Sequence, residues 1–351
     1  MFGLLSSAGV FGCMADMLVA IYKATGSHAI LKWVDDFCVV CLPHQSWTKN
    51  DFIDLTASFG VQWSMKKTRP LATKQQYISF NWNLCAHSVA VPPKKLSQIC
   101  SLLDQWLTQD TSFSAKEVAS LHGMLVHISC VFPLIRPFLQ SISRFAHHFK
   151  SCHARLQVTP LVADLSWVWM LIHALPNEVP LASPQPTDLQ WWGDASTSFG
   201  IGIALDCYWV VWKWVPSFEV SPHKGFDIGW AEAVAVEPGL RIAIHLHLLD
   251  SADPARQVFL VQSENSGIVT ITKKGHSQSK ETNRTLKHIF LLQVLPQHHV
   301  WLKAIHVPSH INISDVLSQG DINGFLHSFP SITIQVSLPV PTHLSDKLVS
   351  L

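Results

Sequence analysis

Apolar residues recur at two spacings along the chain, and the changes between these spacings divide it into regions. Near the N-terminus, apolar positions lie three to four apart in residues 9–22 and 48–59, which predicts two helices. Three segments instead have the β-branched and aromatic runs typical of paired strands: residues 30–42, 77–84 and 88–91. These patterns together predict a small α+β domain over residues 1–91.

The middle of the chain has helical spacing alone. Amphipathic patterns cover four segments: residues 94–107, 114–130, 134–149 and 159–174. Four closely spaced prolines follow: Pro176, Pro180, Pro184 and Pro186. Proline lacks the backbone N–H that a helix needs, so we expect a helical domain over residues 92–180 and then a linker.

The last region alternates between strands and helices. Strand patterns cover residues 189–193, 199–205, 208–214, 257–262 and 299–307, and helical patterns cover residues 229–247, 266–273 and 280–295. This order predicts a mixed sheet covered by helices over residues 187–320. Residues 321–351 are rich in turn-forming residues, and we expect an irregular tail there. The predicted fold class is multidomain α+β.

Composition narrows the class of protein. Apolar residues make up 48% of the 351 positions and charged residues 14%, which excludes a disordered chain. The net charge of +1 means that nucleic-acid binding would depend on local patches. Eight dispersed cysteines do not form a disulfide scaffold, and the apolar run 10–22 is too short to span a bilayer. We therefore expect an intracellular protein of the cytoplasm or nucleus.

Four acidic residues lie where predicted strands end or helices begin: Asp194, Glu232, Glu264 and Asp315. Taken alone, each is better explained as a solvated loop carboxylate or a helix N-cap than as a catalytic acid. In a mixed α/β sheet, however, strand ends and helix starts converge, and converging carboxylates repel one another unless cations neutralise them. Hard oxygen ligands select Mg²⁺ or Mn²⁺, and two such ions about 4 Å apart promote phosphodiester cleavage.

The residues around each acid form an ordered set of motifs: GDAST at 193–197, WAEA at 230–233, SEN at 263–265, VPSH at 307–310 and NISD at 312–315. This set resembles the ribonuclease H domain attached to retroelement reverse transcriptases. The resemblance implies cleavage of the RNA strand of an RNA–DNA hybrid. It also implies that the four acids hold two Mg²⁺ or Mn²⁺ ions, and that His310 assists product release.

Two departures from the family pattern argue against full activity. Position 264 is Glu where the family has Asp, which moves the carboxylate about one methylene further from the strand. Glu237-Pro238-Gly239 places a helix breaker inside the helix that carries Glu232, at a cost of about 3 kcal/mol for the proline. We interpret both departures as lesions in a decaying enzyme.

Asp35 and Asp36 are adjacent carboxylates within a predicted hairpin, where an ordinary acidic turn is the simplest interpretation. Their surroundings are SAGVFG at 7–12, FGVQW at 59–63 and YISFNW at 77–82. This succession resembles the reverse-transcriptase palm of DIRS-type, tyrosine-recombinase retrotransposons, and residues 94–144 resemble their thumb and connection. The resemblance implies that Asp35 and Asp36 are remnants of a polymerase metal site.

Polymerases of this family need a further Asp on an earlier strand. We therefore expect an N-terminally truncated palm without polymerase activity, whose missing half belongs to the parent element. Four lysines are candidate phosphate contacts, and a solvated face explains them equally well: Lys66, Lys67, Lys273 and Lys274.

Three hypotheses follow for the function. The first is a ribonuclease H that depends on two Mg²⁺ or Mn²⁺ ions and binds an RNA–DNA hybrid or another nucleic-acid duplex. The second is a catalytically inactive nucleic-acid-binding protein or a vestigial transposon remnant. The third is a working polymerase, which requires a partner chain to supply the missing half.

Overall fold

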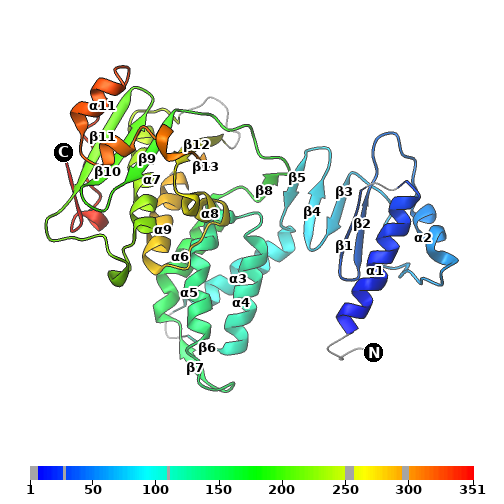
Figure 1. Cartoon of the computed structure of the whole chain (residues 1–351). Helices are drawn as coiled ribbons and strands as arrows, with labels where there is room; N and C mark the ends of the chain where they lie inside the picture. The colour runs from blue at the N-terminus through cyan, green and yellow to red at the C-terminus, as the bar shows by residue number, and fades with distance from the viewer. Residues whose placement is uncertain (1–6, 27–28, 109–110, 250–256, 295–299) are drawn as a thin grey trace. The chain divides into compact units, whose positions relative to one another are not determined.

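The computed structural model describes residues 7–26, 29–108, 111–249, 257–294 and 300–351 (Figure 1). The chain forms two compact units. The first unit contains Met1–Lys95 and Glu178–Leu181, and the second contains Leu96–Asn177 and Ala182–Leu351. The helical region and the C-terminal sheet, predicted to be separate domains, therefore belong to the same unit.

The first unit begins with helix α1 (Ser7–Ala24), which packs on the hairpin of β1 (Ala29–Trp33) and β2 (Asp36–Val40). Helix α2 (Lys49–Ala57) starts at a capping box made by Thr48 and Asp51. Tyr22 joins the two helices, because its ring stacks on Phe52 and its hydroxyl donates to the Phe52 carbonyl at 2.6 Å.

A four-stranded antiparallel sheet completes the first unit, in the order β3 (Lys74–Tyr77), β4 (Phe80–Asn83), β5 (Ser88–Ala90) and β8 (Glu178–Pro180). The strand predicted over residues 77–84 corresponds to β4, except that Tyr77 belongs to β3. Ile78 and Ser79 have positive φ angles and form a tight turn between β3 and β4.

Strand β8 lies within the proline-rich segment that was expected to be a linker. Its residues pair with β5, and the Leu181 N–H donates to the His87 carbonyl at 2.7 Å. A proline is tolerated there because β8 is an edge strand, so the missing N–H interrupts no second ladder.

Four helices lead into the second unit, as predicted: α3 (Pro93–Leu107), α4 (Ala115–Ile128), α5 (Arg136–Ala146) and α6 (Val162–Ala174). A short antiparallel pair, β6 (Ser112–Ser114) and β7 (Arg155–Gln157), lies among them. Their apolar faces are buried at helical spacing, for example at Val118, Leu121 and Leu125 of α4.

Seven strands form the mixed sheet of the second unit. Along the sheet they run β13 (Val300–His306), β12 (Gln257–Ser263), β9 (Trp191–Ala195), β10 (Gly200–Leu205), β11 (Tyr208–Trp214) and β14 (Ile334–Gln335), and β15 (Leu348–Ser350) also pairs with β11. β9, β10 and β11 are antiparallel, whereas β9, β12 and β13 are parallel. This confirms the predicted α+β fold class with a mixed sheet.

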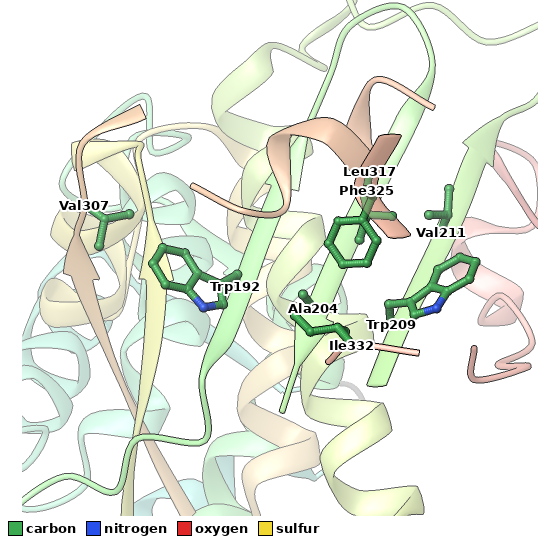
Figure 2. Packing of buried hydrophobic residues seen from close by; sticks show 8 residues of the cluster. All are labelled: Trp192, Ala204, Trp209, Val211, Val307, Leu317, Phe325 and Ile332. Atoms are coloured by element: carbon green, nitrogen blue, oxygen red, sulfur yellow. The ribbon is translucent and has the colours of Figure 1, made fainter. Parts of the chain in front are cut away.

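Helices cover both faces of this sheet. On one face lies α7 (Ile228–His245), where a Cβ added to Gly193 would come 3.4 Å from the Ala235 carbonyl oxygen. On the other face, Leu317 and Phe325 lie over Trp192, Ala204 and Trp209 of three neighbouring strands (Figure 2). Those two residues come from α10 (Asp315–Ser318) and α11 (Ile322–Ser328).

The expectation of an irregular tail over residues 321–351 is corrected by these contacts. The segment contains α11, β14 and β15, and Trp212 Nε1 donates to the Leu338 carbonyl at 3.1 Å. The tail covers the β11 edge, because β14 and β15 both pair with β11.

Side chains of α5 attach the helical region to the turn between α8 (Ser266–Lys274) and α9 (Lys280–Val294). Arg136, Gln140 and Arg144, one helical turn apart, donate to the carbonyls of Lys274, Ser277 and Gln278 at 3.4, 2.8 and 3.3 Å. These bonds explain why no boundary separates the helices from the sheet.

Within the described ranges, no helix has the length and apolar character needed to span a membrane.

Candidate metal centre

Three of the four predicted carboxylates meet at one edge of the sheet in the second unit. Asp194 lies in β9, Glu232 lies in the second turn of α7, and Glu264 directly follows β12. β9 and β12 are parallel neighbours, so their carboxyl ends lie at the same edge. One ligand atom from each of the three residues lies within 4.8 Å of the others.

Asp315 lies beside this trio and is not part of it. It is the first residue of α10, and its Oδ1 accepts a hydrogen bond from Gln319 Nε2 at 2.7 Å. Its negative charge nevertheless contributes to raising the pKa values of Asp194 and Glu232.

The remaining predicted residues lie outside the trio. His310 is exposed in a 3-10 turn, Ser309–Ile311, and Lys273 and Lys274 are exposed in the last turn of α8. In the first unit, Lys66, Lys67, Asp35 and Asp36 are exposed. Among the residues that the structure describes, Asp35 and Asp36 belong to no group of three metal-ligating side chains.

The environment of Glu232 is unusual for a carboxylate. Its residue exposure is 5%, and its Oε2 is buried without a hydrogen-bond partner within the described ranges. Burial, and then the charges of Asp194 and Glu264, raise the pKa of Glu232 to about 9. At neutral pH the metal-free side chain is therefore protonated.

The pKa of Asp194 is also raised, but by less than that of Glu232. Burial raises its pKa to about 6, a hydrogen bond from Ser318 opposes the rise, and the charge of Glu264 adds to it. Three carboxylates with one unpartnered buried oxygen are the donor set that a hard divalent cation prefers. The residues of the trio therefore fit a Mg²⁺ or Mn²⁺ ion.

Two polar residues that the sequence analysis did not assign contact the trio. Ser318 Oγ donates to Asp194 Oδ2 at 2.5 Å, and Asn312 Nδ2 lies 3.3 Å from Asp194 Oδ1. Both side chains are buried. The available sequence signal was the placement of each residue three positions from Asp315.

Gly202 explains how Ser318 reaches Asp194. Gly202 lies directly opposite Asp194 in the β9–β10 pair, so both face the same side of the sheet. A Cβ at this position would come 2.5 Å from the backbone nitrogen of Ser318. The absence of a side chain thus lets α10 lie directly on β10.

The fold accommodates both Glu264 and the Pro238-Gly239 pair. The longer Glu264 side chain still places a carboxylate oxygen in the trio. Helix α7 continues through Pro238, and Gly239 lies against Trp191, where a Cβ would come 2.1 Å from the indole nitrogen.

Glu237 also has a defined role in this packing. Its side chain is fully buried and accepts from Arg241 Nε and Nη2 at 2.9 and 2.6 Å, and His343 Nε2 lies 3.1 Å away. Hydrogen bonds and positive charge from these partners hold the pKa of Glu237 below its ordinary value, against the effect of burial. Residues 237–239 therefore link α7 to β9 through Trp191 and to the C-terminal tail through His343.

Comparison with known proteins finds no matching family model and no matching curated protein. Among solved structures, the chain is similar to a foamy viral protease-reverse transcriptase dRH in complex with double-stranded DNA. The identity is 16% and the TM-score 0.39, over 87% of this chain and 50% of that one.

A foamy viral protease-reverse transcriptase in complex with an RNA/DNA hybrid gives 16% identity and a TM-score of 0.37. That match covers 88% of this chain and 39% of the viral one. This chain thus spans half or less of the length of either viral protein.

Proposed function

We propose that the second unit is a divalent-metal-dependent nuclease of the ribonuclease H type, which hydrolyses the RNA strand of an RNA–DNA hybrid. The observation that carries this proposal is the trio of Asp194, Glu232 and Glu264, of which the first two are buried. Glu232 Oε2 has no hydrogen-bond partner among the residues that the structure describes. Grouping these acids does not help a fold that binds no cation, because burial and mutual repulsion disfavour their ionised forms. Cation binding is the function that offsets this penalty.

The residues have distinct roles in the proposed reaction. Asp194, Glu232 and Glu264 would hold one ion, and Asp315 would share a second ion with Asp194. When bound, such ions make water nucleophilic at neutral pH and neutralise the leaving oxygen. Ser318 orients Asp194, and exposed His310 would assist product release.

The duplex would contact cationic side chains through its phosphates. Lys273 and Lys274 are exposed at the end of α8, the helix that follows Glu264. The order of the motifs also supports an origin in a DIRS-type retrotransposon reverse transcriptase with an attached ribonuclease H domain. We propose no polymerase function, because Asp35 and Asp36 lack a third ligand among the residues described.

The test is cleavage of an end-labelled RNA–DNA hybrid with Mg²⁺ or Mn²⁺. We expect metal-dependent cutting that falls at least about 100-fold in Asp194→Asn, because this change removes a ligand charge. Asp206→Asn is the matched control. Asp206 is exposed in a turn with φ of 53°, a conformation that Asn adopts readily.

The other outcomes separate the alternatives. Cutting by Glu264→Asp but not by the natural sequence would indicate a decayed enzyme. No cutting by either protein would contradict the proposal and leave a catalytically inactive nucleic-acid-binding protein or a vestigial remnant.

A further inference from the structure

One neutral side chain lies between two of the three carboxylates. Asn312 is 5% exposed and follows the turn Ser309–Ile311. Its Nδ2 lies 3.3 Å from Asp194 Oδ1 and 3.5 Å from Glu264 Oε2. A primary amide has two N–H donors, so this group can serve both carboxylates at once without adding charge.

The amide orientation is fixed from its other end. Asn312 Oδ1 accepts hydrogen bonds from Ser314 Oγ at 2.7 Å and from the Ser314 backbone N–H at 3.3 Å. Rotating the amide by half a turn would direct its NH₂ at the Ser314 N–H and its oxygen at two carboxylates. Both contacts would be repulsive, so the amide donors face the trio.

We propose that Asn312 is a positioning residue, which holds Asp194 and Glu264 at ligand spacing before a divalent cation binds. This inference rests on the proposed nuclease function, because that function assigns metal ligation to both acids. The effect is greatest for Glu264, since glutamate has one more rotatable bond to restrain than aspartate. Both amide contacts are longer than the usual 2.9–3.0 Å, so each is weak and can yield to a cation.

The test is calorimetric titration of the full chain with Mn²⁺ in the absence of nucleic acid. Asn312→Ala removes both donors, and we expect Mn²⁺ affinity to fall about tenfold, as for other groups that orient metal ligands. The matched control is Asn265→Ala. Asn265 adjoins Glu264, but its side chain caps α8 by accepting from the Gly267 N–H.

Two further variants test how Asn312 acts. Ser314→Ala keeps the amide but removes the hydroxyl that orients it, so its loss of affinity should be smaller than that of Asn312→Ala.

In a Glu264→Asp background, the shorter side chain needs less restraint. Asn312→Ala should therefore weaken Mn²⁺ binding less there than in the natural sequence, whereas a purely structural role would give additive effects.

The outcomes distinguish this inference from the proposed function. Unchanged Mn²⁺ affinity in folded Asn312→Ala would overturn the inference, and if that variant does not fold, unchanged affinity in Ser314→Ala would do so. Asn312-dependent binding without hybrid cleavage would keep the inference and contradict the nuclease. Cleavage with Asn312-independent binding would contradict the inference alone, and a chain that binds no Mn²⁺ would contradict both.

Discussion

Glu232 shows how strongly the fold can change the chemistry of one residue. In the unfolded chain its carboxyl ionises near its ordinary pKa of 4.5, and in the fold burial and neighbouring acids raise that pKa to about 9. Between these pH values the folded protein holds a proton that the unfolded chain has released. Since the folded state then binds more protons, the free energy of unfolding decreases as pH rises through this range.

Replacing Glu232 by Gln removes this dependence. Without divalent cations, we expect the Tm of Glu232→Gln to lie near that of the natural sequence at pH 5 and several degrees above it at pH 8. Thermal unfolding of both proteins in a chelator, at the two pH values, measures the difference. An equal Tm difference at both pH values would contradict the raised pKa.

At the residue scale, the sequence identifies the acids but not their neighbours. Asp194, Glu232 and Glu264 are recognisable because they lie near the ends of strands or in the first turns of a helix. Asn312 and Ser318 contact Asp194 across 118 and 124 positions, a separation that no local pattern encodes. Their roles become visible only once α10 lies on β10.

At the scale of elements, the contact between α7 and β9 depends on one missing side chain. A Cβ at Gly239 would overlap the Trp191 indole, with approaches of 2.1 Å to Nε1 and 2.3 Å to Cε2. Trp191 is fully buried and cannot move aside without displacing the sheet core.

Gly239→Ala should therefore lower the free energy of unfolding by about 1–3 kcal/mol, the usual effect of overpacking. Gly123→Ala is the matched control, because the Cβ added to Gly123 in helix α4 would meet no described atom within 4 Å outside its chain neighbours and the helix's own backbone. There the better helix propensity of alanine should raise stability by up to about 1 kcal/mol. Urea unfolding of both variants measures the two effects, and a stabilising Gly239→Ala would contradict the packing.

Long periodic elements are the part of the fold that the sequence predicts. The helix over 229–247 and the strand over 257–262 correspond to α7 and β12 within a few residues. β8 and β15 have three residues each, too few to show alternation, and they pair with strands distant in the chain. The packing role of Gly239 was equally hidden in the sequence, because its partner Trp191 belongs to another element.

At the scale of the whole molecule, two compact units predict two unfolding transitions, and only the second unit contains the carboxylate trio. Mg²⁺ that binds the folded trio should raise the Tm of the second unit alone. At a concentration 100 times Kd we expect a shift of about 5–10 °C. Differential scanning calorimetry with and without Mg²⁺ measures it.

Two variants make this experiment decisive. Gly239→Ala should lower the transition of the second unit and so identify it. Asp194→Asn should retain both transitions and lose the response to Mg²⁺. A Mg²⁺ shift of equal size in both transitions, or an undiminished shift in Asp194→Asn, would place the bound ion elsewhere.

The edge strand β8 has a consequence for how this protein can be divided. The chain leaves the first unit after Lys95, returns for Glu178–Leu181, and leaves again at Ala182. A fragment that stops at residue 95 would expose β5 as an open edge, a template for aggregation. A single proteolytic nick after Lys95 would still leave β8 hydrogen-bonded to β5. A soluble version of the first unit therefore requires residues 178–181 to be rejoined to it through a designed linker.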